Sequence, residues 1–500
     1  MKIIDSNIEK NTSYNADIVI IGAGIIGIFL TFLLKKTKYK IILIDRGNKN
    51  FNYFKEIRTI NKGTYHASSQ SSKAFTLGGK SSLWGGQLSE FRKEDIQKNF
   101  WGLQYNELKK LYNSLYKTLH LKCNDKIIYN KNFKIGFYFT YFLKEPNLFK
   151  YFKNRILNAK NILIISNLVA QELVFKNKKV EFLKCKNNKN NLIDIKAKKF
   201  ILCLGTIENI RFFLTNKALS RNNPLKKLKF IGCFFQDHLA ITFGKLTVKS
   251  KTKFSNLFEN RLLNDLIHQP KMCNVINNKN QLSMTASFIS QSHENKLIYK
   301  AKNNLSGFKK NLNIKNFIKL LNFKYFKYVV LYIFHYMIFK RIKLYFGNTV
   351  KMHIISEQTP ISDSKITINN KKLKDGLNQA ILNWKTDTKE FDQIKIFIKE
   401  LVLFFNQSRI GKLDVKKDFL KYKKFKKNIT DTNHASGGLK ISKNSKEGVC
   451  DKNFKVWGTS NLFVAGSALF PNSGHSNVTL TAMALTLKLS KHILKKNNTN

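Results

Sequence analysis

The sequence predicts an α/β fold built around a Rossmann-like parallel sheet, and three observations near the N-terminus predict it. Residues 18–21 are an apolar, β-branched run typical of a buried parallel strand. Glycines follow at the spacing GxGxxG, and an apolar stretch of helical length continues over residues 25–34. A second apolar run, residues 40–44, ends at Asp45. Strand, glycine turn, helix and strand in this order indicate a βαβ unit.

The glycine turn of Gly22, Gly24 and Gly27 predicts a dinucleotide site. Glycines let the backbone turn tightly and approach a pyrophosphate at the N-terminus of the next helix. Asp45 follows Gly24 by about 20 residues, where an acid can accept hydrogen bonds from ribose hydroxyls. This pattern alone leaves both FAD and NAD open.

Five further segments resemble the glucose-methanol-choline (GMC) oxidoreductases. They are the loop LGGKSSLWGG at residues 77–86, the strand and turn at 200–211, the Q-D-H element at 236–238, and two C-terminal signatures at 433–438 and 472–481. The resemblance extends from about residue 15 to about residue 495, and the middle third supports it least. It implies that the dinucleotide is FAD.

The resemblance also implies which residues hold the cofactor. They are Gly22, Gly24, Gly27, Asp45, Gly78, Gly79, Ser81, Ser82, Gly205, Gly466, Ser467 and Thr479. Within the family, the segment at residues 101–112 looks most like the bacterial sugar and polyol dehydrogenases and the pyranose oxidases. Leu83 stands where pyranose oxidases carry a flavin-linked histidine, so we expect FAD to be bound noncovalently.

The chemistry that the resemblance implies needs a base. Oxidation of an alcohol removes the hydroxyl proton while a hydride leaves for flavin N5, and a neutral imidazole is a suitable base near neutral pH. His434 aligns with the family's catalytic histidine and Asn477 with the residue that holds the substrate oxygen. The helix expected to begin near Val478 would direct its N-terminal amides towards the flavin.

Three other polar residues near these motifs have less direct interpretations. We expect Asp237 and His238 to brace a loop of the cofactor domain rather than to react. For His475 two interpretations remain, contact with the substrate and simple filling of space. We expect no metal site.

The motif order implies that the FAD-binding domain is discontinuous and is assembled from residues 12–95, 155–245 and 430–496. Residues 96–154 are expected to connect the domains and cover the flavin. Residues 246–429 are expected to form an α+β substrate-binding domain with an antiparallel sheet. Within that domain, 351–357 and 364–368 look like strands, and 390–405 has helical apolar spacing.

Three polar or basic stretches are expected to be loops, namely residues 186–191, 303–313 and 421–427. Six cysteines show neither CxxC spacing nor a pairing pattern, which favours reduced thiols. The N-terminus carries no pattern of a signal peptide, so the expected location is the cytoplasm, with membrane association as an addition.

The net charge of +58, from 89 basic and 31 acidic residues, would ordinarily favour nucleic acid or an anionic membrane as a partner. Lys, Asn, Ile and Phe share AT-rich codons, and all are frequent here, so genome composition is a competing cause. No nucleic-acid motif accompanies the charge. We therefore expect no specific nucleic-acid partner.

A peripheral membrane contact is predicted for residues 308–346, where basic and aromatic residues alternate. The apolar run at 328–339 is shorter than the roughly 20 residues needed to span a bilayer, but such a helix can lie in the interface. A helix that packs in the core or covers the flavin is the alternative.

Two functions remain after these observations. The first is an FAD-dependent oxidoreductase acting on a CH–OH group of a sugar, polyol or other alcohol, with dehydrogenase favoured over oxidase and an unidentified electron acceptor. The second is a flavin-fold protein that mainly binds a membrane surface or an anionic polymer, with weak or different redox chemistry.

Overall fold

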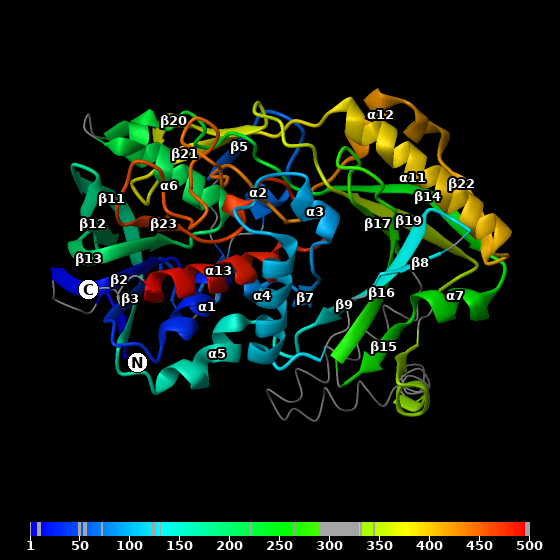
Figure 1. Cartoon of the computed structure of the whole chain (residues 1–500), viewed down its shortest axis with the longest axis horizontal. Coiled ribbons are helices and arrows are strands. Elements are labelled where there is room, and N and C mark those ends of the chain that lie inside the picture. The colour runs from blue at the N-terminus through cyan, green and yellow to red at the C-terminus, as the bar shows by residue number, and fades with distance from the viewer. Residues whose placement is uncertain are drawn as a thin grey trace.

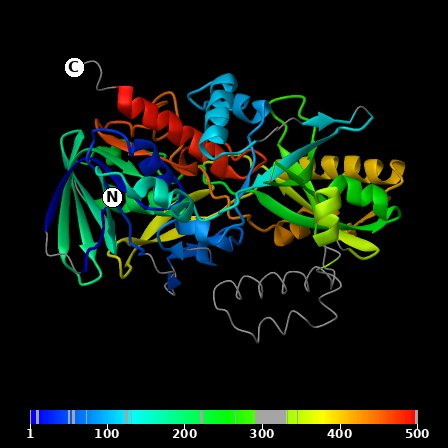
Figure 2. The same ribbon diagram turned by 90° about the horizontal axis from the view of Figure 1, so that it is seen from below.

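The computed structural model describes residues 2–7, 12–48, 52–53, 58–71, 74–122, 127–130, 132–219, 223–264, 266–289, 330, 333–343 and 346–495. These residues form an elongated molecule with one large sheet towards each end (Figure 1). A view turned by 90° shows the same division (Figure 2).

The sheet nearer the N-terminus, here called the mixed sheet, has the strand order β1-β10-β3-β2-β13-β12-β11, and β23 also pairs with β13. Its strands are β1 (Lys2–Asp5), β2 (Ser13–Ile21), β3 (Ile41–Ile44), β10 (Ile162–Ser166), β11 (Leu168–Lys176), β12 (Lys179–Asn187), β13 (Leu192–Leu202) and β23 (Leu462–Val464). Pairing is parallel from β1 to β13 and between β13 and β23, whereas β11 and β12 pair antiparallel.

The predicted βαβ unit is present at the centre of this sheet. Helix α1 (Ile25–Leu34) joins β2 to β3, which pair in parallel. The apolar residues 18–21 and 41–44 are buried, as expected for central strands. Helix α1 packs against α5 (Leu148–Leu157) and α13 (Val478–Lys495), so the C-terminal helix lies beside the first helix (Figure 1).

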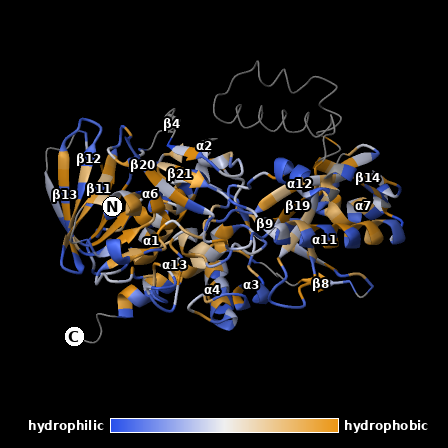
Figure 3. Cartoon of the chain, turned by 90° about the horizontal axis from the view of Figure 1, so that it is seen from above, coloured by the Kyte–Doolittle hydropathy of each residue, from blue (hydrophilic) through white to orange (hydrophobic). Residues whose placement is uncertain are grey.

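The antiparallel sheet has the order β18-β15-β16-β17-β19-β14-β22, and β9 pairs with β16, β7 and β8. Its strands are β7 (Gln87–Leu88), β8 (Ile128–Tyr129), β9 (Ile135–Phe142), β14 (Leu239–Val248), β15 (Asn260–Leu263), β16 (Leu266–Asn274), β17 (Met284–Ile289), β18 (Arg341–Ile342), β19 (Thr349–Ser356) and β22 (Gly411–Val415). Helices α7 (Lys251–Phe258) and α11 (Thr388–Gln407) lie along this sheet, and α11 has polar and apolar sides (Figure 3).

Smaller elements complete the described fold. Two small sheets contain β5 (Thr59–Asn61), β20 (Lys365–Lys372) and β21 (Asn378–Asn383), and β4 (Asn52–Tyr53) and β6 (Ala74–Phe75). The other helices are α2 (Ser68–Ser71), η1 (Gly79–Ser82), α3 (Lys93–Gln97), α4 (Tyr105–Thr118), α6 (Thr206–Leu219), η2 (Pro224–Lys227), η3 (Lys417–Leu420), α12 (Tyr422–Asn428) and η4 (Ser467–Leu469).

Most predicted elements of the middle region are confirmed, but the predicted loop at 421–427 is wrong, and the predicted loop at 186–191 holds only for residues 188–191. β19, β20 and α11 coincide with the predicted strands and helix. Most of residues 421–427 lie in α12 (Tyr422–Asn428), where Phe425 is buried and packs at a tilt against Phe391 with ring centroids 5.0 Å apart. Lys186 and Asn187 end β12, since the Asn187 side chain is buried and donates a hydrogen bond to the Ser6 carbonyl.

The predicted domain boundaries, the residues outside the described part and the cysteines are considered next. β9 and β14 belong to the antiparallel sheet although they precede residue 246, so the division into domains stays a prediction. Residues 303–313 and 308–329 lie outside the described residues. Five cysteines are free thiols, as expected, and Cys123 lies outside the described part. Among the described helices, none combines the length and apolar character needed to cross a membrane.

Candidate active site

The glycine turn between β2 and α1 is shaped by contacts that exclude a side chain at two positions. A Cβ on Gly22, whose φ is +105°, would lie 2.8 Å from the Cys203 carbonyl oxygen, and one on Gly27 would lie 1.8 Å from the Gly22 carbonyl oxygen. The Cβ position of Gly24 faces open space, with no atom within 4 Å. The turn is therefore tightly packed at Gly22 and Gly27, and it is open at Gly24, where a phosphate would approach the start of α1.

Asp45, at the end of β3, braces this turn. One carboxylate oxygen accepts the Ala23 N–H at 2.6 Å and the other accepts the Gly47 N–H at 2.6 Å. Burial raises the pKa of Asp45 to about 6, while the two amides act in the opposite direction. Each oxygen keeps a lone pair, which is the requirement for accepting a ribose hydroxyl.

The predicted flavin loop lies directly on the glycine turn. The Gly78 N–H donates to the Ala23 carbonyl at 2.8 Å, and a Cβ on Gly79 would lie 3.0 Å from the Gly24 Cα. The two serines of the loop are engaged within the protein. Ser81 Oγ donates to the Gly78 carbonyl, and Ser82 Oγ accepts from the Asn147 side chain at 3.1 Å.

A third set of residues joins the same edge of the mixed sheet. The hydroxyls of Thr206 and Ser467 both donate to the Ala435 carbonyl, at 2.8 and 2.9 Å. Gly205 has φ +83° with open space at its Cβ position, and the Cβ position of Gly466 is 3.8 Å from Ile26 of α1. The open positions at Gly24 and Gly205 fit an extended dinucleotide, whose backbone contacts a side chain would obstruct.

Thr479 and Asn477 lie at the start of α13. Thr479 is half-buried in the first turn, and Asn477 immediately precedes the helix. Among the described residues, nothing forms a hydrogen bond with the half-buried Asn477 side chain. Its amide is therefore available to a ligand.

His434 is held in one tautomer by His238. The Nε2 atom of His238 lies 3.0 Å from the Ser473 carbonyl, which can only accept, so a neutral His238 carries its proton there and accepts at Nδ1. The two Nδ1 atoms of His238 and His434 are 2.8 Å apart. His434 must then donate from Nδ1, which leaves its Nε2 as an unprotonated base.

Thr432 and Asp237 support the same assignment. The Thr432 hydroxyl donates to Asp237 Oδ1 at 3.1 Å, and its oxygen accepts from His434 Nδ1 at 2.8 Å. Asp237 Oδ1 also accepts the backbone N–H groups of His238 and His434, at 2.7 and 3.1 Å. Asp237 therefore ties the loop that carries His434 to the start of β14.

The electrostatics keep this imidazole neutral. Burial, with a smaller contribution from His238, lowers the pKa of His434 to about 3, although Asp237 acts in the opposite direction. Burial would raise the pKa of Asp237, but the hydrogen bond and charge of His66 hold it well below its usual value. At neutral pH the site thus combines a neutral base with a nearby carboxylate.

His66, Asp237 and Asp431 offer ligand atoms within 4.8 Å of one another, the spacing of a metal site. The Ser69 N–H donates to His66 Nδ1 at 3.1 Å, so His66 carries its proton on Nε2 and donates it to Asp237 at 3.1 Å. Both oxygens of Asp431 accept from the Ser68 N–H. The cluster is satisfied by hydrogen bonds, with no free nitrogen for a metal.

His475 lies in a neighbouring buried cluster. Its Nδ1 is 2.9 Å from Asp95 Oδ2, and its ring packs edge-on against Tyr138 with centroids 5.4 Å apart. Burial, followed by the positive charge of Arg92, lowers the pKa of His475 to about 4. The side chain thus links the loop before α13 to the antiparallel sheet, and its two sequence interpretations both stay open.

The part played by His238 was not recognised from the sequence. It and His434 are 196 residues apart, and no local spacing connects them. The Q-D-H element places His238 beside Asp237 in the sequence, but it does not reveal that the His238 ring contacts His434.

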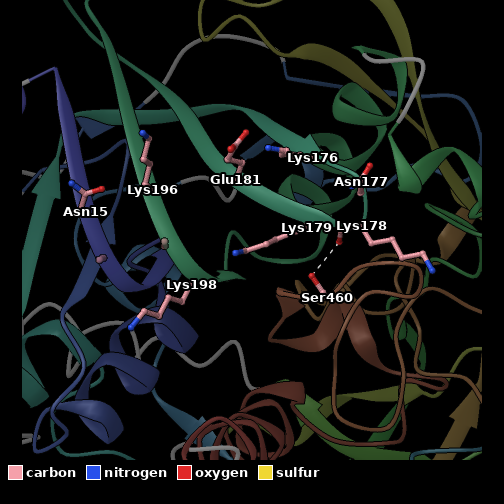
Figure 4. A pocket seen from close by; sticks show the side chains of 11 residues that line it. Asn15, Lys176, Asn177, Lys178, Lys179, Glu181, Lys196, Lys198 and Ser460 are labelled. Atoms are coloured by element: carbon pink, nitrogen blue, oxygen red, sulfur yellow. Dashed lines mark hydrogen bonds between the residues drawn. The ribbon is translucent and has the colours of Figure 1, made fainter.

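A cavity of about 600 Å³ lies elsewhere, beside β2, β13, β12 and β11 of the mixed sheet (Figure 4). Its lining is rich in lysine and includes Lys176, Lys178, Lys179, Lys196 and Lys198. None of the predicted site residues lines it. It is therefore separate from the histidine site.

Comparison with known proteins tests the resemblance. Residues 360–486 match the family model described as GMC oxidoreductase. A pyridoxine 4-oxidase structure from Mesorbium loti is similar at 11% identity and a TM-score of 0.62, covering 96% of this chain and 99% of that chain. A formate oxidase is similar at 13% identity and 0.59, covering 98% and 99%. A formate oxidase variant from Aspergillus oryzae RIB40, described for its effect on FAD modification, is similar at 14% and 0.59, covering 98% and 99%.

No curated protein matches the sequence. At these identities the structural likeness shows the mixed α/β fold alone. The named neighbours are oxidases, so the expected preference for a dehydrogenase is not supported.

The likeness to sugar and polyol dehydrogenases and to pyranose oxidases stays a prediction. FAD is the cofactor of the matched family. The match over residues 360–486 confirms the resemblance to the GMC oxidoreductases for the C-terminal part of the chain, and the solved structures show a similar fold.

Proposed function

We propose that the protein is an FAD-dependent oxidoreductase that oxidises a CH–OH group of a sugar, polyol or other alcohol. The observation that carries this proposal is the tautomer of His434, whose Nε2 is left unprotonated by the contact with His238. FAD, when bound, would accept the hydride. Because Leu83 stands at the position of the flavin-linked histidine of pyranose oxidases, the proposed binding is noncovalent.

The side chains have distinct parts in this proposal. His434 Nε2 accepts the hydroxyl proton, and its Nδ1–H stays hydrogen-bonded to His238 and Thr432. Asp237, held in place by His66, stabilises the imidazolium that forms. The Asn477 amide donates to the substrate oxygen, which fixes the alcohol beside the base. The N-terminal amides of α13 favour negative charge close by.

The test begins with the visible spectrum of the purified protein, followed by anaerobic addition of a panel of sugars and alcohols. Bleaching of the oxidised-flavin band by one substrate class is the expected result. His434→Ala should keep the flavin and lose the bleaching by a factor of about 10² to 10⁴. His120→Asn is a matched control, because His120 is exposed and has φ +52°, which asparagine tolerates.

Other outcomes would redirect the proposal. A folded protein without flavin would contradict the cofactor, and a bound flavin that no alcohol reduces would contradict the reaction. Oxygen consumption, compared with reduction of an artificial dye, identifies the electron acceptor. Rapid oxygen consumption would indicate an oxidase, and reduction of the dye alone would indicate a dehydrogenase.

We also propose that the protein is cytoplasmic and that it makes a peripheral membrane contact. Large apolar side chains are exposed close together, with Phe334 58% and Met337 65% accessible, and they are followed directly by Lys340 and Arg341. This is the pattern of a helix lying in an anionic interface. Sedimentation with anionic and neutral vesicles tests it, and binding should fall in Phe334→Ser/Met337→Ser. Equal sedimentation of the variant would contradict the contact.

A further inference from the structure

The antiparallel sheet has two chemically different faces. One face is apolar and packs against the helices, as in the ring contacts Phe288–Phe254 and Phe137–Phe404. The other, here called the polar face, carries Thr242, Tyr138, Thr140, Gln269, Lys271, Thr285, Ser287 and His353. A sheet normally exposes one polar face to water, but this face makes contacts with segments of the candidate site.

The strand register places the central members of the polar face in one row. Lys271 of β16 pairs with Tyr138 of β9, and Ser287 of β17 pairs with His353 of β19. His353 in turn pairs with Thr242 of β14, whose hydroxyl is 3.3 Å from its Nδ1. Because Cβ atoms of adjacent strands are about 5 Å apart, these side chains form a continuous surface.

Two sets of contacts and one chain connection join this surface to the candidate site. Tyr138 packs against His475, two residues before Asn477. Gln87, which follows the predicted flavin loop, donates to Thr140 and to Gln269 at 2.7 and 2.8 Å. His238, the partner of His434, immediately precedes β14. The polar face is thus one wall of the space in which a substrate of His434 would lie.

Lys271 is the exceptional residue of this wall. Among the described residues, no acceptor or carboxylate pairs with its ammonium group, although the side chain keeps partial access to open space. Burial lowers the pKa of Lys271 to about 8, and burial together with Lys271 lowers the pKa of His353 to about 4. A poorly solvated cation without a partner is unfavourable unless a ligand supplies the opposite charge.

Acidic residues near this wall are already engaged. Asp95 interacts with His475, and its other oxygen accepts from Ser283 Oγ. Glu357 pairs with Lys98. Asp95 and Glu357 are therefore committed elsewhere, and no carboxylate among the described residues pairs with Lys271.

We propose that Lys271 binds an acidic group of the substrate, so that the substrate class is an alcohol bearing a carboxylate or a phosphate. This inference rests on the proposed oxidation at His434 and adds the recognition of the non-reacting end. The anionic group would lie on the polar face beside Tyr138 and Ser287, and the reacting hydroxyl would lie at His434 and Asn477.

The kinetic test compares anionic alcohols with neutral partners of the same shape. The pairs are lactate with lactamide and glycerol phosphate with glycerol, and the readout is anaerobic flavin reduction. The anionic member should be preferred, and Lys271→Met should lower its kcat/KM about 10- to 100-fold, mainly through KM. Neutral alcohols should change little. Lys271→Arg should restore part of the preference.

Lys351→Met is the matched control. Lys351 lies on β19, two residues before His353, and is exposed, so this variant loses the same charge outside the enclosed wall. Its preference for anionic alcohols should equal that of the unmodified protein. Equal loss in both variants would indicate general electrostatic attraction by this basic protein and would overturn the proposal.

Calorimetric titration with acetate and with inorganic phosphate tests binding without turnover. Binding should be present in the unmodified protein and in Lys351→Met, and absent in Lys271→Met. The stronger ligand of the two distinguishes a carboxylate from a phosphate. If both bind, but no alcohol reduces the flavin, the oxidation at His434 fails while the anion site stands. If neither binds, or if neutral alcohols react as well as anionic ones, the role of Lys271 is wrong.

Discussion

The glycine-rich edge of the mixed sheet and the polar face of the antiparallel sheet differ in how completely their groups are satisfied. At the glycine edge, Asp45 accepts two backbone amides and the loops fit together around positions without Cβ atoms. At the polar face, Lys271 has no partner among the described residues and His353 is held neutral. The polar groups of the first region thus have partners within the protein. The second region contains a charged group whose partner a ligand would supply, as expected of a site that selects its substrate.

The largest effect is expected from glycines of the complete region. Gly27→Ala places a Cβ against the Gly22 carbonyl, which belongs to the backbone and cannot move aside, so the free energy of unfolding should fall by about 3 kcal/mol or more. Gly24→Ala meets open space at φ −73°, so the fold should keep its melting temperature while bound flavin is lost. Thermal unfolding and flavin content of both variants test this. Flavin retained at full occupancy in Gly24→Ala would contradict the placement of the cofactor.

A smaller effect on rate is expected at the junction of the two regions. His238→Phe removes one of the two acceptors, with Thr432, that fix the His434 tautomer, so kcat should fall on the order of 10- to 100-fold with KM nearly unchanged. His238→Asn offers a carbonyl acceptor and should recover part of the rate. The flavin spectrum should be the same in both. A purely structural role would instead change flavin binding or KM along with kcat.

Because Lys271 has a buried charge without a partner, we expect the folded protein to become more stable when this charge is removed. Its folded pKa of about 8 lies below the ordinary 10.5, so the folded state disfavours the charged form at neutral pH. Lys271→Met should raise the free energy of unfolding at pH 7, by less than the roughly 3 kcal/mol that complete desolvation would give, because the side chain keeps partial access to open space. The unfolded chain binds the extra proton between these two pKa values, so the gain should shrink as the pH rises from 8 to 10.5. A variant less stable than the unmodified protein at pH 7 would show that the ammonium is satisfied.

The last prediction concerns stability in acid. Burial lowers the pKa values of His434, His475 and His353 to about 3, 4 and 4. The unfolded chain then binds more protons below about pH 6.5, so stability is lost as the pH falls from there towards 4, by up to about 1.4 kcal/mol per pH unit for each histidine. His353→Gln should flatten the fall in melting temperature between pH 7 and pH 5. An unchanged slope would place His353 in contact with water.

The elements that sequence reasoning predicted correctly are those set by local patterns. Helix α1, strands β2 and β3, and helix α11 follow from apolar periodicity and glycine spacing within a few tens of residues. Residues 421–427 were predicted as a loop because their lysines mask a single anchoring aromatic side chain. Phe425 makes them helical by packing against Phe391, a contact that no local pattern reveals.

The candidate site divides in the same way. Glycines, the acid after β3 and the motif around His434 are visible in the sequence because backbone geometry and residue chemistry restrict what can occupy those positions. The contact of His238 with His434 and the row of polar side chains that contains Lys271 depend on strand pairing between distant segments. The burial that gives those side chains their charge states depends on the same pairing. A linear sequence specifies which side chains are available, but partners and solvent access are collective properties of the packed chain, and they arise only when the two sheets meet.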